Sequence, residues 1–230
     1  MEAILLAGGK AERLGDAAQG LPKALVPVNG RPLAAYQIAL LAAAGVGRVI
    51  VSCAAGKGGL FESELQQLGP EVVCAEEPEI LGRGGGLRFA ASHRVEVGDV
   101  YALNGDELLD LDFGALLARH RGSAAAATIT VAQVRSPFGV VELDGNLVRG
   151  FREAPVLPEW VSCGVYVLGD EALARLPERG DHELSTFPEL AAEGKLGAFR
   201  HDGVWLTVNN PKDLRRAEEH LAANPGWFPP

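Results

Sequence analysis

The chain carries, at residues 6 to 32, the segment LAGGKAERLGDAAQGLPKALVPVNGRP. Its first residues, Leu6 and Ala7, continue an apolar run that is typical of a buried parallel strand. Gly8 and Gly9 have no Cβ atoms, so a ligand could lie against the main chain and accept hydrogen bonds from its N–H groups. Three cations follow in the same loop: Lys10, Arg13 and Lys23. A glycine turn after a first strand, followed by spaced cations, predicts a binding site for a polyphosphate.

The first half of the chain alternates between strand-like and helix-like runs. Strands are predicted at 3–7, 48–53, 71–75 and 99–104, and helices at 32–44, 59–68, 84–94 and 112–121. Such alternation predicts an α/β fold, with a Rossmann-like, mixed but mostly parallel sheet and helices on both faces. Ligands of such sheets bind beyond the carboxyl ends of the strands. Gly8 and Asp106 both follow strand ends, so we expect them along one edge.

The second half is richer in strands. They are predicted at 124–133, 139–143, 147–152 and 161–168, with a tight hairpin turn at Asp144-Gly145-Asn146. Helices are predicted at 184–194 and 211–223. Asn210 is expected to cap the last helix, with Pro211 at its first position. We expect a single domain over residues 1–230, whose halves, about 1–120 and 121–230, share one sheet.

Composition narrows the class of protein. The net charge of −9 argues against a nucleic-acid partner, which usually requires a basic face. Within residues 8–31, however, four cations face two acids, which favours a small anionic ligand. No apolar run reaches the roughly 18 residues needed to span a bilayer, and the N-terminus lacks a basic n-region, so neither a membrane partner nor a signal peptide is expected. Cys53, Cys74 and Cys163 lie far apart in apolar runs, which indicates reduced thiols in the cytoplasm.

The opening segment resembles the N-terminal signature of the sugar-1-phosphate nucleotidyltransferases. That signature, L-A-G-G-x-x-x-R-L and then P-K-x-L-x-P-V-x-G-x-P, is matched here by Leu6-Ala7-Gly8-Gly9, Arg13-Leu14, Pro22-Lys23, Leu25, Pro27-Val28, Gly30 and Pro32. The resemblance is to enzymes of the mannose-1-phosphate guanylyltransferase and glucose-1-phosphate thymidylyltransferase type, without a C-terminal β-helix domain. It implies the nucleotide-diphospho-sugar transferase fold, a nucleotide-binding first half and a sugar-side second half. The alternative is a glycine-rich βα loop without particular chemistry.

A second motif, Val100–Asp106, is an apolar strand that ends in Asn104-Gly105-Asp106. Family members carry a similar strand, and the resemblance implies that Asp106 binds Mg²⁺ against the nucleotide phosphates. The physical chemistry agrees, because magnesium prefers oxygen ligands and usually takes one or two carboxylates together with phosphate and water. The alternative for Asp106 is a turn residue after a strand. Asp112 is expected to cap the next helix.

A third motif reads Leu81-Gly82-Arg83-Gly84-Gly85-Gly86-Leu87 and resembles the family's L-G-T-A-G-A-L. Arg83 stands where threonine is usual. The resemblance implies that glycine backbone lies against the base and ribose. The predicted nucleotide-binding residues are therefore those of the two glycine motifs and the strand end: Leu6, Ala7, Gly8, Gly9, Gly82 and Gly105.

The sugar-side half matches the family less well. Phe138-Gly139-Val140-Val141 resembles Y-G-V-V, Phe151-Arg152-Glu153-Ala154-Pro155 resembles F-x-E-K-P, and Val161-Ser162-Cys163-Gly164 resembles V-N-A-G. The resemblance makes Gly139, Glu153 and Ser162 the candidate substrate-binding residues. The family's lysine is Ala154 here and its asparagine is Ser162, which leaves the identity of the sugar open.

Near the C-terminus the family often reads G-x-W followed by D-I-G-T-P, and its aspartate is a second metal ligand. Here Trp205 is followed by Thr207-Val208-Asn209-Asn210-Pro211, so that carboxylate is missing. The run resembles that of the N-acetylglucosamine-1-phosphate uridylyltransferases, in which an asparagine serves the metal. Asn209 is therefore the candidate second Mg²⁺ ligand, with a structural turn as the alternative.

The resemblance implies an enzyme that transfers a nucleoside monophosphate from a nucleoside triphosphate to a sugar 1-phosphate and releases pyrophosphate. Arg13, Lys23 and Asp106 are the candidate catalytic residues. The two cations would hold the phosphates, and Mg²⁺ would offset the charge that develops. Two alternatives stay open. One is the same chemistry on another acceptor, such as a molybdopterin or a polyol phosphate, and the other is a non-catalytic nucleotide-sugar binder. Neither the base nor the oligomeric state can be inferred from the sequence.

Overall fold

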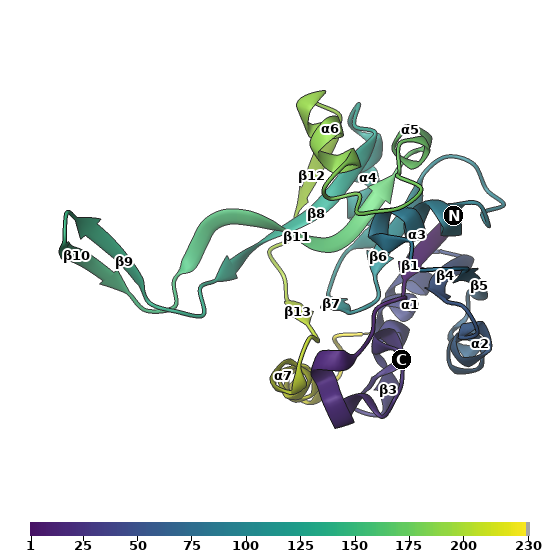
Figure 1. Ribbon diagram of the computed structural model, residues 1–230, viewed down its shortest axis with the longest axis horizontal. Coiled ribbons are helices and arrows are strands. Elements are labelled where there is room, and N and C mark those ends of the chain that lie inside the picture. The colour runs from purple at the N-terminus through teal and green to yellow at the C-terminus, as the bar shows by residue number, and fades with distance from the viewer. Residues whose placement is uncertain (229–230) are drawn as a thin grey trace.

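A seven-stranded sheet lies at the centre of the protein, whose computed structural model describes residues 1–228 (Figure 1). The strand order is β12-β8-β11-β6-β1-β4-β5. Parallel pairs join β1 to β4 and β6, β4 to β5, and β12 to β8, whereas β11 runs antiparallel to both of its neighbours. The strands are β1 (Glu2–Leu6), β4 (Arg48–Ala54), β5 (Glu71–Glu77), β6 (Val100–Asn104), β8 (Ala127–Arg135), β11 (Val156–Leu168) and β12 (Leu196–Arg200).

Helices cover both faces of this sheet, because successive strand residues point to opposite sides. Leu5, Val51 and Leu103 pack on one side with α1 (Leu33–Ala43), α2 (Gly58–Leu65) and α4 (Phe113–Arg121). Ile4 and Ile50 pack on the other side with α3 (Gly82–Ala91), α5 (Asp170–Ala174) and α6 (Thr186–Ala192). The predicted fold class is confirmed. Within residues 1–228, no helix is both long enough and apolar enough to cross a bilayer.

A third apolar cluster joins the N-terminal loop to the C-terminal helix. Leu14, Val28, Leu206 and Leu214 are among its members. The elements that meet there are η1 (Glu12–Ala18), β2 (Pro27–Val28), α1, β7 (Glu107–Leu109), β13 (Trp205–Thr207) and α7 (Pro211–Ala223). The short strand β3 (Arg31–Pro32) pairs with β2. Two further short 3-10 helices are η2 (Lys23–Leu25) and η3 (Gln66–Leu68). This cluster holds the loop that contains Arg13 and Lys23 against the end of the chain.

Several local predictions agree with the structure. Asn210 caps α7, because its side chain accepts hydrogen bonds from the main-chain N–H groups of Lys212 and Asp213. Asp112 caps α4 by accepting from the N–H of Ala115, 2.8 Å away. Other predictions were incomplete: β7, β12, β13 and α5 were not predicted, and β11 begins at Val156 rather than at residue 161.

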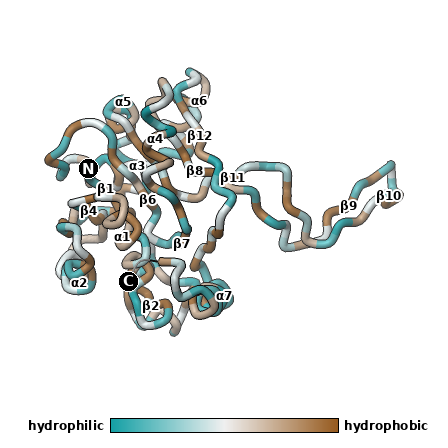
Figure 2. Tube along the Cα trace, turned by 180° about the vertical axis from the view of Figure 1, so that it is seen from behind, coloured by the Kyte–Doolittle hydropathy of each residue, from teal (hydrophilic) through white to brown (hydrophobic). Residues whose placement is uncertain are grey.

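The predicted hairpin around residues 144–146 forms a two-stranded ribbon of its own. It consists of β9 (Val140–Asp144) and β10 (Leu147–Arg152), and we call it the arm. The arm extends far from the sheet, as Figure 1 shows. Apolar residues alternate with polar ones along it in Figure 2.

Candidate active site

The ends of β1 and β6 lie side by side, which brings two sequence motifs together. Leu6 is paired with Asn104 in the parallel ladder. The N–H of Gly105 then donates to the carbonyl of Leu6 at 2.8 Å. A Cβ at position 105 would lie only 2.7 Å from that carbonyl oxygen, so the close approach of the two loops requires glycine.

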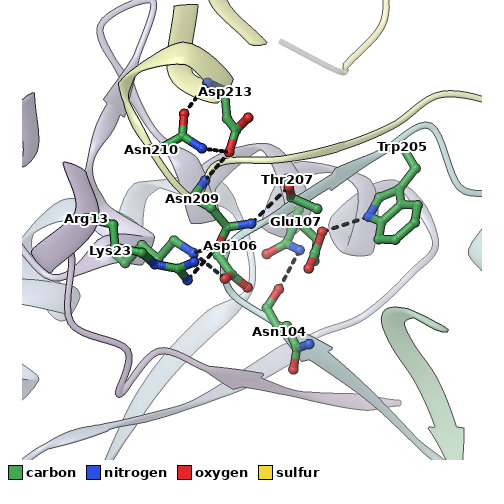
Figure 3. Close-up of polar contacts among 11 residues, drawn as sticks. Arg13, Lys23, Asn104, Asp106, Glu107, Trp205, Thr207, Asn209, Asn210 and Asp213 are labelled. Carbon is green, nitrogen blue, oxygen red and sulfur yellow. Dashed lines mark hydrogen bonds and ion pairs between the residues drawn. The ribbon is translucent and has the colours of Figure 1, made fainter. Parts of the chain in front are cut away.

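Lys23 lies where these loops meet the C-terminal segment. Its ammonium Nζ donates to Asp106 Oδ2 at 2.5 Å and to Asn209 Oδ1 at 2.6 Å (Figure 3). Only 8% of Lys23 is exposed, and its main-chain N–H donates to Gly9 at 3.3 Å. Because the ammonium group is shielded from water, its interaction with the Asp106 carboxylate is stronger than that of a surface ion pair.

Asn209 is held so that its side-chain oxygen faces the cations. Its Nδ2 donates to Thr207 Oγ1 at 3.0 Å, and its main-chain N–H donates to Asp213 Oδ2 at 3.1 Å. These contacts orient the amide, and Oδ1 then accepts from Arg13 at 3.3 Å as well as from Lys23. The three predicted catalytic residues and the second predicted metal ligand thus converge on one point.

The pairing of β7 with β13 places Asn209 there. Thr207 lies opposite Glu107 in this antiparallel pair, and the N–H of Val208 donates to the carbonyl of Asp106 at 3.2 Å. Glu107, which the sequence reasoning missed, is buried and accepts from Trp205 Nε1 at 2.7 Å. Burial, and next the negative charge of Asp106, raise the pKa of Glu107 to about 8. Its position directly after Asp106 was the only signal in the sequence.

A cavity of about 240 Å³ opens at this point. Six of its lining residues were predicted to bind nucleotide or to act in catalysis. The full lining is Leu6, Ala7, Gly9, Lys23, Ala24, Arg83, Asn104, Gly105, Asp106 and Glu107. Gly8 lines a second cavity of about 390 Å³, together with Gly9 and Lys10. The glycine loop therefore lies between two adjoining cavities.

Arg83 also lines the smaller cavity. Its guanidinium contacts Asp181, and its NH1 lies 2.7 Å from Glu183 Oε2. The hydroxyl of Tyr166 donates to Glu183 Oε1 at 3.0 Å. The sequence showed Arg83 in place of the usual threonine but gave no sign of its two acidic partners, which lie about a hundred residues away in the chain.

The glycines of the third motif approach their own chain closely. A Cβ at Gly82 would lie 2.7 Å from the carbonyl oxygen of Gly180, and one at Gly84 would lie 2.7 Å from the main-chain nitrogen of His182. The absence of side chains there is explained by this packing alone. A role for Gly82 in nucleotide binding stays a prediction.

The predicted substrate-binding residues lie outside the group formed by Arg13, Lys23, Asp106 and Asn209. Gly139 and Glu153 lie just outside the two ends of the arm, and neither lines the cavity of about 240 Å³. Ser162 lies in β11, where it is paired with Val131. Its hydroxyl is 3.4 Å from the N–H of Gly164, which donates to it. The structure therefore does not bring Gly139 and Glu153 to Lys23.

The donor set around Lys23 suits magnesium. Asp106 offers a carboxylate oxygen and Asn209 an amide oxygen, and both lie within hydrogen-bond distance of one atom. Magnesium accepts such a small set of hard ligands when phosphate and water complete its octahedron. Among residues 1–228, no group of three or more His, Cys, Asp or Glu side chains forms a separate metal site.

Comparison with known proteins gives the chain's relatives. A model of the family described as nucleotidyl transferase matches residues 2–224. The catalytic subunit beta of mannose-1-phosphate guanylyltransferase from Danio rerio is 30% identical, over 99% of this chain and 70% of that protein. The chain spans 62% to 70% of the length of the curated relatives that we compared.

Solved structures share the fold. HddC from Yersinia pseudotuberculosis, complexed with GMP-PN, has a TM-score of 0.74 at 22% identity, with 96% of this chain and 99% of that chain covered. The inositol-1-phosphate CTP transferase from T. maritima has a TM-score of 0.74 at 21% identity, covering 96% and 94%. The family match extends over nearly the whole chain and includes the glycine loop, Lys23 and Asp106. The chain therefore belongs to the nucleotidyl transferase family.

Proposed function

We propose that the protein transfers a nucleoside monophosphate from a nucleoside triphosphate to a sugar 1-phosphate, with Mg²⁺ as cofactor and pyrophosphate as the second product. The observation that carries this proposal is the position of Lys23 Nζ, 2.5 Å from Asp106 and 2.6 Å from Asn209 beside a glycine loop. A buried cation between two oxygen ligands is suited to a polyphosphate with its metal ion.

In this reaction an oxygen of the sugar 1-phosphate attacks the α-phosphorus, and the bond from that phosphorus to the bridging oxygen breaks. Lys23 stabilises the charge on the α-phosphate, and Arg13 grips the departing pyrophosphate with its planar fork. When bound, magnesium held by Asp106 and Asn209 would supply Lewis acidity to the phosphate oxygens. Glu107, whose pKa is raised by burial, lies directly after Asp106 and is held in place by Trp205 Nε1. Catalysis thus depends on positioning and on charge.

Arg83 suits the acceptor side of the site. It lines the same cavity as Lys23 and Asp106, and Asp181 and Glu183 fix its guanidinium. The family's usual lysine is absent at Ala154, and Arg83 is a second cation, besides Lys23, that lines this cavity, so we infer that it contacts the phosphate of the acceptor. An Arg83→Lys variant should raise KM for the sugar 1-phosphate and leave KM for the nucleotide unchanged.

We infer that guanosine triphosphate is the donor. The curated relatives are named as guanylyltransferases. Glu77 lies beside the glycine loop, because a Cβ at Gly8 would be 3.6 Å from its Oε1. Its Oε1 accepts from Ser52 Oγ at 2.7 Å and its Oε2 accepts from the N–H of Leu81 at 3.2 Å. A carboxylate oxygen can accept more than one hydrogen bond, and we infer that Glu77 also accepts from the N–H groups of guanine. Glu77→Gln should weaken the preference for guanosine triphosphate over other nucleotides. We place the enzyme in the cytoplasm, a proposal supported by its three free cysteines.

One experiment tests the reaction. The purified protein is incubated with each of the common nucleoside triphosphates and a panel of acceptors, namely several sugar 1-phosphates and a polyol phosphate, with and without Mg²⁺, while pyrophosphate is measured. Release with a sugar 1-phosphate that depends on Mg²⁺ supports the proposal. Release only with the polyol phosphate would favour the same chemistry on another acceptor. Nucleotide binding without any release would favour a non-catalytic binder.

A further inference from the structure

One ammonium group bridges the two side chains that were assigned to the metal ion. Lys23 Nζ lies 2.5 Å from Asp106 Oδ2 and 2.6 Å from Asn209 Oδ1, and Figure 3 shows the three side chains converging. The Lys23 side chain is only 10% exposed, against 30% for Asp106. The lysine therefore holds, from a position shielded from water, the same two oxygen atoms that the proposed reaction gives to magnesium.

An ammonium group and a magnesium ion make competing demands on these oxygens. Mg²⁺ binds through oxygen lone pairs and tolerates little departure from octahedral geometry. The Lys23 ammonium group donates to both oxygens, so it lies against the lone pairs that a metal ion would need. Two positive charges at close range also repel each other strongly where water is largely excluded. Binding of a divalent cation by Asp106 and Asn209 therefore requires that the ammonium group move away.

The main chain of Lys23 is fixed, whereas its side chain can turn. The N–H of Lys23 donates to the carbonyl of Gly9 at 3.3 Å, and its carbonyl accepts from the N–H of Val26 at 3.1 Å. The side chain is a flexible stem that ends in a compact charge. It lines the cavity of about 240 Å³, which Gly9 also lines. Rotation of the side chain alone can therefore carry Nζ from the two oxygens towards the glycine loop.

We propose that Lys23 excludes divalent cations from Asp106 and Asn209 until a nucleoside triphosphate binds. Without a nucleotide, a move away from the two oxygens would leave a shielded positive charge without a partner, which is costly. A phosphate beside the glycine loop gives the ammonium group a new partner and frees both oxygens for the metal ion. This role of Lys23 rests on the proposed function, because the phosphate of the donor is what releases the lysine.

The movement of Lys23 adds to the coupling between metal and nucleotide. Part of that coupling is general, because phosphate oxygens complete the coordination of the metal ion in any such site. The rest arises because whichever ligand binds first bears the cost of moving the lysine, and the second ligand then binds without that cost. Only this second part is lost when the ammonium group is removed, so the two parts can be separated by a variant.

Binding of Mn²⁺, followed through the electron paramagnetic resonance signal of the free ion, tests the proposal without turnover. In the absence of nucleotide, Lys23→Met should bind Mn²⁺ about ten-fold more tightly than the wild type, because no ammonium group competes for the oxygens. Lys10→Met is the matched control. It removes one positive charge from the same loop, but Lys10 is 74% exposed and pairs with Glu12. Its affinity for Mn²⁺ should stay within about two-fold of the wild type.

The same titrations are repeated with a non-hydrolysable analogue of guanosine triphosphate. The analogue should tighten Mn²⁺ binding by a smaller factor in Lys23→Met than in the wild type or in Lys10→Met. Equal Mn²⁺ affinities of the wild type and Lys23→Met without nucleotide would overturn the exclusion, even if the wild type releases pyrophosphate. An equal gain in both lysine variants would do the same, since net charge alone would then explain it. If none of the three proteins binds Mn²⁺, the metal site of the proposed function fails as well.

A crystal structure of the wild type with Mn²⁺ and the analogue does not depend on the folding of any variant. We expect Mn²⁺ on Asp106 and Asn209, and Lys23 Nζ within hydrogen-bond distance of a phosphate oxygen. An ammonium group that still donates to both side-chain oxygens beside the bound metal ion would refute the proposal.

Discussion

We expect the loss of Lys23 to impair the proposed reaction most. Lys23→Ala should lower kcat by about 10²–10³, because one charge-stabilising donor contributes on the order of 3–4 kcal/mol to the transition state. Pyrophosphate release measures the rate, and circular dichroism checks the fold. Lys195→Ala is the matched control, since Lys195 lies in a surface ion pair with Glu171. Equal rates for the wild type and the Lys23 variant would remove Lys23 from the mechanism.

His182 makes stability depend on pH. It is buried between the rings of Tyr166 and Phe187, and among the described residues neither of its ring nitrogens has a hydrogen-bond partner. Burial lowers the pKa of His182 to about 4. In the unfolded chain it titrates near its ordinary value of about 6.5, so between these two values the unfolded state binds the additional proton.

The free energy of unfolding should therefore fall as the pH is lowered through this window. From pH 7.5 to 4.5, His182 should account for roughly 2–3 kcal/mol of the loss. Urea titrations of the wild type and of His182→Gln isolate this contribution, since other groups titrate equally in both. If the two proteins show the same difference between the two pH values, His182 is not the group responsible.

At the scale of single residues, the sequence identified Lys23 and its two partners, Asp106 and Asn209, but it did not identify the other acidic residues around the cavity. Lys23 and Asp106 belong to short motifs, and short motifs can be read from the chain. Glu107, Asp181 and Glu183 belong to no such pattern. Their importance comes from burial and from contacts across long sequence separations, which only the folded chain creates.

The N-cap of α7 links helix stability to the site, because Asn209 immediately precedes Asn210. Asn210 Oδ1 accepts from the N–H groups of Lys212 at 2.9 Å and Asp213 at 3.0 Å. Asn210→Ala should lower the free energy of unfolding by about 1 kcal/mol. Lys212→Ala, in the same exposed turn, should change it by less than about 0.5 kcal/mol. Equal effects in urea titration would contradict the capping role.

The sequence predicted long elements well and short ones poorly. Apolar runs such as those of β1 and β4 indicate buried strands, and the Asn210-Pro211 pair indicates a helix start. β7 and β13 have three residues each, too few for any periodicity. They nevertheless place Asp106 beside Asn209, so the pairing that brings these two residues together could not be predicted from the sequence.

At the scale of the whole molecule, a nucleotide should hold the two ends of the chain together. Magnesium and guanosine triphosphate at about one hundred times the dissociation constant should add about 2.7 kcal/mol to stability. For a chain of this length that corresponds to a rise in Tm of roughly 5–10 °C. Calorimetry measures the shift, and Asp106→Ala should abolish it. An unchanged wild-type Tm with all of the common nucleoside triphosphates would contradict nucleotide binding.

The alternation of strands and helices in the sequence predicted the overall architecture. It did not predict the direction in which the arm extends. Gly139 and Glu153 were expected near the substrate because their motifs resemble those of the family. A hairpin has the same local pattern whether it folds back or extends outward. Its direction is set by the pairing of Arg135 with Val156 and by the neighbouring contacts, which local sequence does not encode.

The hydrogen bond from Val208 to Asp106 has a consequence for biosynthesis. During translation the glycine loop and Asp106 leave the ribosome long before Asn209 is made. A nascent chain can therefore build its first parallel strands early, but Lys23 gains its second oxygen partner only when the last helix has been released. Nucleotide should then bind poorly to ribosome-held chains that end before residue 209 and tightly to chains in which α7 has left the ribosome.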